Sequence, residues 1–117
     1  MTKTIHYDLE ERTLIFAKDC RIFVKLLPKT IGNIEDGKQL INSSGSVGAN
    51  YIEANEALSK NDFTHRIKIC RKEAKESSYW LRLVDTNNKE ELEKERKLLI
   101  KEAIELMKIF GSILRKT

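Results

Sequence analysis

Two pairs of glutamates stand three residues apart in the middle of the chain, Glu53 with Glu56 and Glu73 with Glu76, and His65 lies between the pairs. Carboxylates and imidazoles on neighbouring helices can hold two metal ions, but the ferritin-like arrangement requires a Glu-x-x-His pair on each of two helices. The chain contains no Glu-x-x-His sequence, and helical periodicity places all four glutamates off the apolar stripes. We therefore expect no metal site.

The remaining reactive residues do not form a catalytic group. His6 and His65 are isolated, and no Gly-x-Ser-x-Gly motif occurs. The run of residues 43–46 (SSGS) lacks the Gly-Lys-Ser/Thr ending of a phosphate-binding loop. Cys20 and Cys70 fall on predicted core stripes without metal-ligand spacing, which favours free buried thiols. We expect no catalytic residue, no cofactor and no enzymatic activity.

A structural role fits the polar residues of this region better. Asn50 and Glu53 lie one helical turn apart on one flank, as do Glu73 and Glu76. If partly buried, Asn50, Glu53 and Glu73 could hydrogen-bond across the seam between their two helices, or across a subunit boundary. Glu56 and Glu76 also fit solvated surface positions.

One face of the third predicted helix carries a row of cations with an aromatic neighbour. Cations neutralise phosphates, and an aromatic ring can stack on an unpaired base. A solvated face with Glu–Lys pairing fits the pattern about as well. The candidate nucleic-acid-binding residues are Lys68, Arg71, Lys72, Lys75, Tyr79 and Arg82.

The charge of the whole chain is divided unevenly. Up to Leu58 there are seven Lys and Arg against eight Asp and Glu, and from Ser59 onward there are fifteen against ten. The net charge of +4 therefore comes from the C-terminal half. A basic half is compatible with a nucleic-acid or acidic-protein partner, and equally with an ordinary helical surface.

Helices must position these residues. With 40% hydrophobic and 34% charged residues, one Pro and five Gly, few places can break a helix. Apolar residues recur at alternating steps of four and three, and Asp8, Ser59 and Asn88 resemble N-caps. The pattern predicts an all-α, up-down-up-down antiparallel four-helix bundle as a single domain over residues 1–117. Its helices are expected at about residues 8–27, 33–58, 61–84 and 88–115.

The central stripes predict the core, and further apolar residues exceed what one bundle needs. Phe16, Cys70, Leu99 and Phe110 should be nearly fully buried, and the second helix's stripe ends at Leu58. The additional residues indicate self-association, or else a wider intramolecular core. Two glycines of the second helix are also interface candidates, because a glycine allows another backbone to approach closely. Alternatively, they mark a kink in the helix. The candidate interface residues are Ile15, Ile22, Leu26, Gly45, Gly48, Ile69, Trp80, Leu98 and Ile109.

The chain resembles the 23S rRNA intervening-sequence protein family, the four-helix-bundle proteins. The resemblance is carried in order over about residues 10–84 by RTLIFA at Arg12, LPKT at Leu27, SVGANYIEA at Ser46, SKNDF at Ser59 and KEAKESSYWL at Lys72. Members of this family are similar to the accessory variability determinant of diversity-generating retroelements. That protein is a basic pentameric bundle that engages reverse transcriptase and nucleic acid.

The resemblance implies a homopentamer and supplies no catalytic residue. Apolar runs are too short to span a bilayer and no secretory signal is visible, so we expect a cytoplasmic protein without membrane partners. The sequence predicts a non-enzymatic homo-oligomeric scaffold that binds nucleic acid, RNA in particular. The alternative is a protein-interaction module, for example an accessory subunit of a reverse transcriptase.

Overall fold

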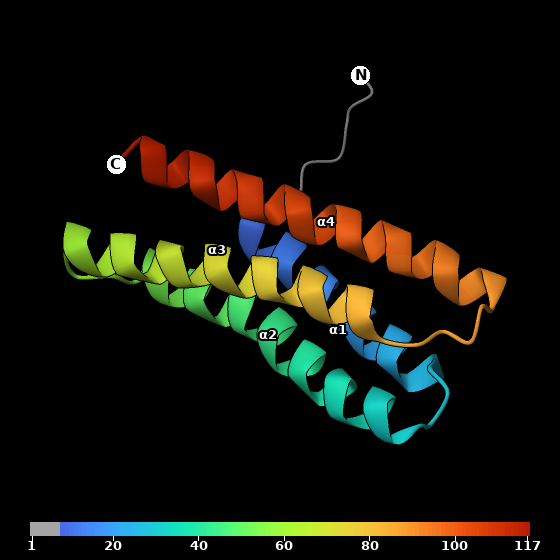
Figure 1. Cartoon of the computed structure of the whole chain (residues 1–117). Coiled ribbons are helices and arrows are strands. Elements are labelled where there is room, and N and C mark those ends of the chain that lie inside the picture. Colours follow the sequence, from blue (N-terminus) through green and yellow to red (C-terminus); the bar gives the residue numbers. More distant parts are fainter. Residues whose placement is uncertain (1–7) are drawn as a thin grey trace.

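The computed structural model describes residues 8–117, in which four long helices alternate in direction (Figure 1). Residues 1–7, with His6 and the start of the predicted domain, lie outside the described residues. Between residues 8 and 117 no strand is present, which confirms the all-α prediction. Each helix packs against the next one, and α4 returns to α1, whereas α1 and α3 lie diagonally apart. The helices are α1 (Leu9–Leu26), α2 (Ile31–Asn55), α3 (Lys60–Leu83) and α4 (Glu90–Arg115).

Side-chain caps start the first three helices. The Asp8 carboxylate accepts a hydrogen bond from the backbone N–H of Glu11 at 2.8 Å, and the Ser59 hydroxyl accepts one from that of Asp62 at 3.0 Å. The second helix begins at residue 31 rather than 33, because the Thr30 hydroxyl accepts from an N–H of its first turn at 3.1 Å. Each cap satisfies a donor that an uncapped helix would leave unpaired.

The predicted cap of the fourth helix is wrong. Asn87 and Asn88 adopt left-handed backbone conformations, with φ of 57° and 56°, which asparagine tolerates better than most residues. They turn the chain, and α4 begins only at Glu90, with Lys89 at the cap position and no side-chain cap. The carboxylates of Glu90 and Glu91 in the first turn instead interact with the positive end of the helix.

The predicted end of the second helix is also wrong. The helix stops at Asn55, and Leu58 beyond it is 96% exposed. Leu58 is therefore not part of the buried stripe of α2, because it lies beyond the last residue of the helix.

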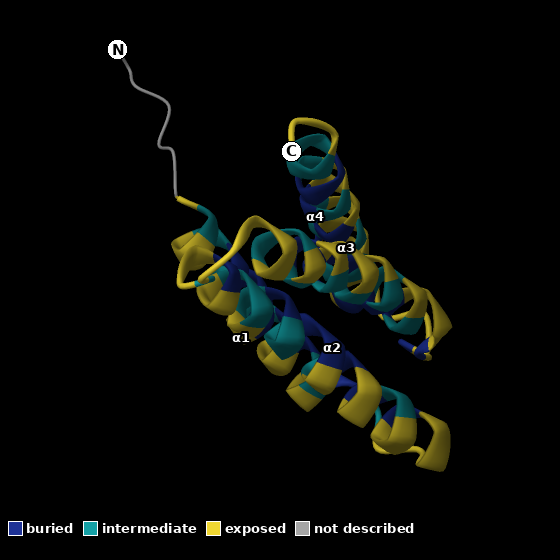
Figure 2. Cartoon of the chain, turned by 90° about the vertical axis from the view of Figure 1, so that its left-hand side faces the viewer, coloured by how far each residue is buried: buried dark blue, intermediate teal, exposed yellow. Residues whose placement is uncertain are grey.

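The core follows the predicted stripes. Phe16, Cys70, Leu99 and Phe110 are each at most 4% exposed, as predicted. Figure 2 shows buried residues on the sides that the helices turn toward each other and exposed residues on the outside. The ring of Tyr51 in α2 lies 5.9 Å from that of Phe110 in α4, so aromatic packing extends across the bundle.

Two polar groups fix the end of the bundle where the α1–α2 and α3–α4 loops lie. The buried Asn33 amide donates to the carbonyls of Pro28 (2.9 Å) and Asp85 (2.8 Å), and its oxygen accepts from the N–H of Asp85 at 2.8 Å. The Arg96 guanidinium bonds the Glu93 carboxylate and donates to three carbonyls at the end of α3, those of Leu81, Arg82 and Val84. Arg96 and the hydroxyl of Thr86 lower the pKa of Glu93 by hydrogen bonding.

Phe110→Ala should lower the free energy of unfolding by about 3–5 kcal/mol, because it leaves a cavity at a fully buried position. Chemical denaturation followed by circular dichroism measures this loss. The control Tyr79→Ala removes a half-exposed ring and should change stability by about 0.5 kcal/mol or less. A loss below about 1 kcal/mol for Phe110→Ala would contradict the packing described for α4.

Candidate nucleic-acid interface

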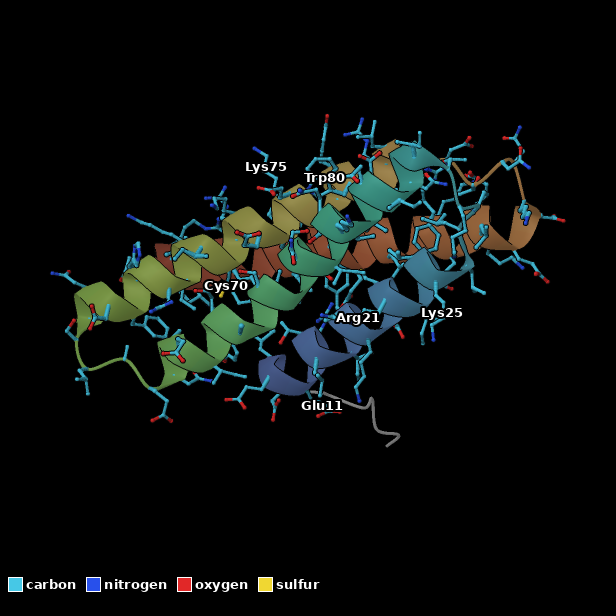
Figure 3. The ribbon with its side chains drawn as sticks, turned by 90° about the horizontal axis from the view of Figure 1, so that it is seen from below. Glu11, Arg21, Lys25, Cys70, Lys75 and Trp80 are labelled. Atoms are coloured by element: carbon cyan, nitrogen blue, oxygen red, sulfur yellow. The ribbon has the colours of Figure 1, made fainter. Side chains whose placement is uncertain are left out.

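The six predicted nucleic-acid-binding residues all lie on the exposed side of α3. Figure 3 shows Lys75 pointing away from the bundle, whereas Cys70 on the same helix points inward. Tyr79 is 53% exposed and stands edge-on against Trp80, with ring centroids 5.0 Å apart. Four of the six line a shallow hollow of about 340 Å³ together with Leu114 of α4: Lys68, Arg71, Lys72 and Lys75. We call this hollow and its residues the cationic hollow.

The cations of this hollow are nearly free of carboxylate partners. Within residues 8–117, Lys72 is the only one of the four with an ion pair, 3.7 Å from the Glu73 carboxylate. Elsewhere in the chain Arg12 and Arg96 form close pairs with glutamates. The Glu–Lys pairing that the alternative prediction of a solvated face included is therefore present only at Lys72 among these four exposed cations.

The structure adds residues of α4 that the sequence analysis missed. Leu114 borders the cationic hollow, and the guanidinium of Arg115 reaches the surface above Gly111 next to that of Arg71. Three lysines, with Glu105 among them, line a second hollow of about 380 Å³ along α4: Lys97, Lys101 and Lys108. The spacing of these lysines, four and then seven residues, is visible in the sequence. Where they lie relative to α3 can be seen only in the folded structure.

The predicted polar network forms at only one of its three positions. The Asn50 oxygen accepts from the Arg66 guanidinium of α3 at 2.9 Å, so this residue does join the two helices. Glu53 is exposed and makes no side-chain hydrogen bond or ion pair with any residue between 8 and 117. Glu73 is partly buried, and its carboxylate meets only Lys72 of its own helix. Burial, with repulsion from Glu76, raises the pKa of Glu73.

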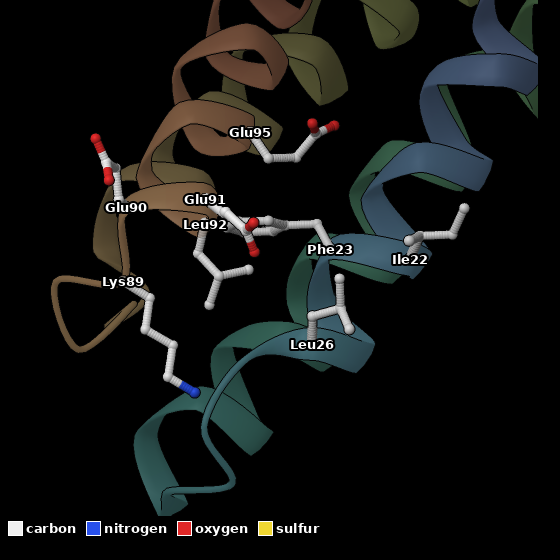
Figure 4. Close-up of a pocket in the computed structure, with 8 residues that line it drawn as sticks. All are labelled: Ile22, Phe23, Leu26, Lys89, Glu90, Glu91, Leu92 and Glu95. Atoms are coloured by element: carbon white, nitrogen blue, oxygen red, sulfur yellow. The ribbon is translucent and has the colours of Figure 1, made fainter.

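Most of the predicted interface residues of α1 and α4 gather along the seam between these helices. Ile22, Leu26 and Leu98 are 58%, 59% and 58% exposed, whereas Ile15 and Ile109 are partly buried. The seam opens at one end into a groove of about 750 Å³ (Figure 4). The residues around this groove are Ile22, Phe23, Leu26, Lys89, Glu90, Glu91, Leu92 and Glu95. A bidentate ion pair between Arg12 and Glu102, at 2.7 and 2.9 Å, joins the two helices farther along.

The remaining interface candidates have neighbours inside the chain. A Cβ on Gly48 would lie 2.8 Å from the Thr13 hydroxyl, so the close approach at this glycine is between α1 and α2. A Cβ on Gly45 would lie 3.6 Å from Nη2 of Arg21 on α1. Trp80 packs partly against the core and donates to the Glu76 carboxylate at 3.4 Å, and Ile69 is partly buried.

Both cysteines are free and buried, as predicted. Burial is the main cause that raises the pKa of the Cys20 and Cys70 thiols to about 12. No group of three or more His, Cys, Asp or Glu side chains within residues 8–117 is arranged to hold a metal ion. None of the helices described between these residues combines the length and apolarity that a bilayer span needs.

Four antiparallel helices around a closed core, with cations on one outer face, define the chain as a helical bundle protein. The family comparison is more specific, because residues 8–112 match the model of the 23S rRNA-intervening sequence protein. The chain belongs to this family, as its sequence motifs predicted.

One similar solved structure is the crystal structure of a protein of unknown function from the S23 ribosomal protein family of Bacteroides thetaiotaomicron. It is 28% identical to this chain, with a TM-score of 0.77, over 92% of this chain and 98% of that one. None of the curated proteins matches the chain.

The two thiols should be inert in the folded protein. At about pH 8, a thiol whose pKa is about 12 is almost entirely protonated, and only the thiolate attacks a disulfide reagent. Labelling with Ellman's reagent should be more than about a hundredfold slower than after unfolding in guanidinium, where both cysteines should react. Fast labelling of either thiol in the native state would contradict its burial.

Proposed function

We propose that this protein is a non-enzymatic, homo-oligomeric scaffold that binds RNA through the basic face of α3. The observation that carries this proposal is the cationic hollow, in which Lys68, Arg71 and Lys75 have no carboxylate partner within residues 8–117. Unpaired surface cations attract a polyanion and release its condensed counterions when it binds. The exposed ring of Tyr79 adds a surface on which an unpaired base can stack.

The assembly part of the proposal rests on the seam between α1 and α4. Three large apolar side chains are more than half exposed there, beside a groove lined by four apolar residues together with Lys89 and three glutamates. A second copy would bury them. Because α1 and α3 lie diagonally across the bundle, contacts at this seam leave the basic face of α3 free.

A ring would repeat this face once per subunit, and five subunits is the number that the family resemblance implies. Linked copies of a weak site bind a long RNA more tightly than one copy does, because each bound site raises the local concentration of the next. Such binding depends on phosphates and therefore carries little sequence preference.

The double charge reversal Lys68→Glu with Lys75→Glu should abolish RNA binding, since it places two carboxylates in the cationic hollow. Fluorescence anisotropy with single-stranded and structured RNA at two salt concentrations measures this. Wild-type binding should weaken steeply with added salt. Helicity and oligomer mass should not change.

The matched control is Lys18→Glu with Lys25→Glu on α1, which has the same seven-residue spacing, the same exposure class and the same change in net charge. Because Lys18 and Lys25 lie one turn from Ile22, the oligomer mass of this variant is measured as well; the mass should equal that of wild type and RNA binding should fall far less. If wild type does not bind RNA at low salt, or if the two double variants bind equally, RNA is not the ligand of this face. The interaction with a protein partner then becomes the better proposal.

Ile22→Glu should reduce the size of the assembly, because it places a charge within an apolar contact. Multi-angle light scattering should give a wild-type mass well above the 13.6 kDa of one chain, and a lower mass for the variant. The control Ile52→Glu alters a half-exposed apolar residue on α2, outside the seam, and should keep the wild-type mass. A wild-type mass near 13.6 kDa at micromolar concentration excludes the oligomer.

A further inference from the structure

We infer that Arg71 of α3 and Arg115 of α4 together form a binding site for one phosphate group. The inference rests on the proposed function and makes it more specific, because it assigns a phosphodiester of the bound RNA to two named side chains. Arg115 was not among the residues that the sequence indicated, and the site spans two helices rather than the one face of α3.

The two guanidinium groups both lie close to Gly111. A Cβ built on this glycine would lie 3.7 Å from Nε of Arg71 and 3.7 Å from Nη1 of Arg115. Gly111 is buried and has no side chain of its own to separate them. Two planar donors from different helices thus reach the same small area of the surface, next to the cationic hollow.

Two positive charges that lie near the same glycine repel each other, and an anion bound between them would turn this repulsion into attraction. Neither Arg71 nor Arg115 lies within ion-pair distance of a carboxylate among residues 8–117. A cation in the last turn of α4 also stabilises the negative end of that helix, which accounts for the charge of Arg115. It does not account for the position of Arg71, which belongs to another helix.

A phosphodiester fits the site better than a single carboxylate does. A guanidinium presents parallel N–H donors that match the oxygens of a phosphate, and two guanidiniums can contact both free oxygens. The adjoining hollow, of about 340 Å³, has room for the attached sugar beside Leu114. The three lysines of this hollow extend the positive surface beyond Arg71 and Arg115. A polymer with repeated phosphates needs such an extended positive surface.

Arginine-to-lysine substitutions test the site, because they keep the charge and remove the paired donors. Arg71→Lys and Arg115→Lys should each weaken the binding of a short single-stranded RNA by about three- to tenfold, with nearly the same salt dependence. The double variant should lose little more than either single one, since both residues hold one phosphate. Arg21→Lys, at an exposed arginine of α1 that has no ion pair within residues 8–117 and lies outside the cationic hollow, is the matched control and should bind as wild type does.

The outcomes separate this site from the proposed function. If wild type binds RNA and both lysine variants bind it as tightly as wild type does, the phosphate site at Arg71 and Arg115 is overturned and the RNA-binding face remains. If RNA does not bind but inorganic phosphate raises the melting temperature of wild type and not of Arg71→Lys, the phosphate site stands without RNA. If oligo-glutamate binds more tightly than RNA and depends on the same arginines, the ligand is a protein carboxylate and the inference is overturned.

Discussion

The close packing of α3 on α2 is the constraint on which the other features depend. The inner side of α3 is narrow and partly built of small residues, among them Ala74 and Ser77. Its contacts with α2 are correspondingly close: the hydroxyls of Ser43 and Ser77 lie 2.9 Å apart, and the Cys70 thiol donates to the Val47 carbonyl at 3.4 Å. Because so little of its circumference is needed for packing, α3 can expose cations over much of the rest.

The two halves of the surface therefore differ in chemistry. The seam of α1 and α4 exposes large aliphatic side chains next to three glutamates, whereas the outer side of α3 exposes lysine and arginine. Their separation follows from the diagonal placement of α1 and α3, which the alternating helix directions impose. One bundle in this way presents an apolar surface and a cationic surface on different sides.

Periodicity predicted the fold and the core because each helix buries one stripe, and Phe16 and Phe110 lie where the alternating steps placed them. The errors fall where local and tertiary effects compete. Asn88 resembled a cap but adopts a left-handed turn conformation, and Leu58 continued a pattern after the helix had ended. The close backbone approach predicted at Gly48 is present, but the neighbour is Thr13 of α1 in the same chain rather than a second subunit. The approach of α3 and α4 side chains to Gly111 depends on helix register, which a single sequence does not contain.

The cationic hollow also lowers the stability of its own helix. Residues three or four apart are neighbours on a helix, and the four cations of this hollow make four such like-charged pairs. Each pair destabilises an isolated helix by about 0.2–0.5 kcal/mol, so together they cost about 1–2 kcal/mol. Of the four cations only Lys72 has an acidic residue at such a spacing, Glu76, so most of this cost is not offset within the helix, whereas Glu93 offsets it for Arg96 on α4. The packing of α3 against α2 and α4 offsets this repulsion in the free protein, whereas a bound polyanion would turn the same charges into a source of stability.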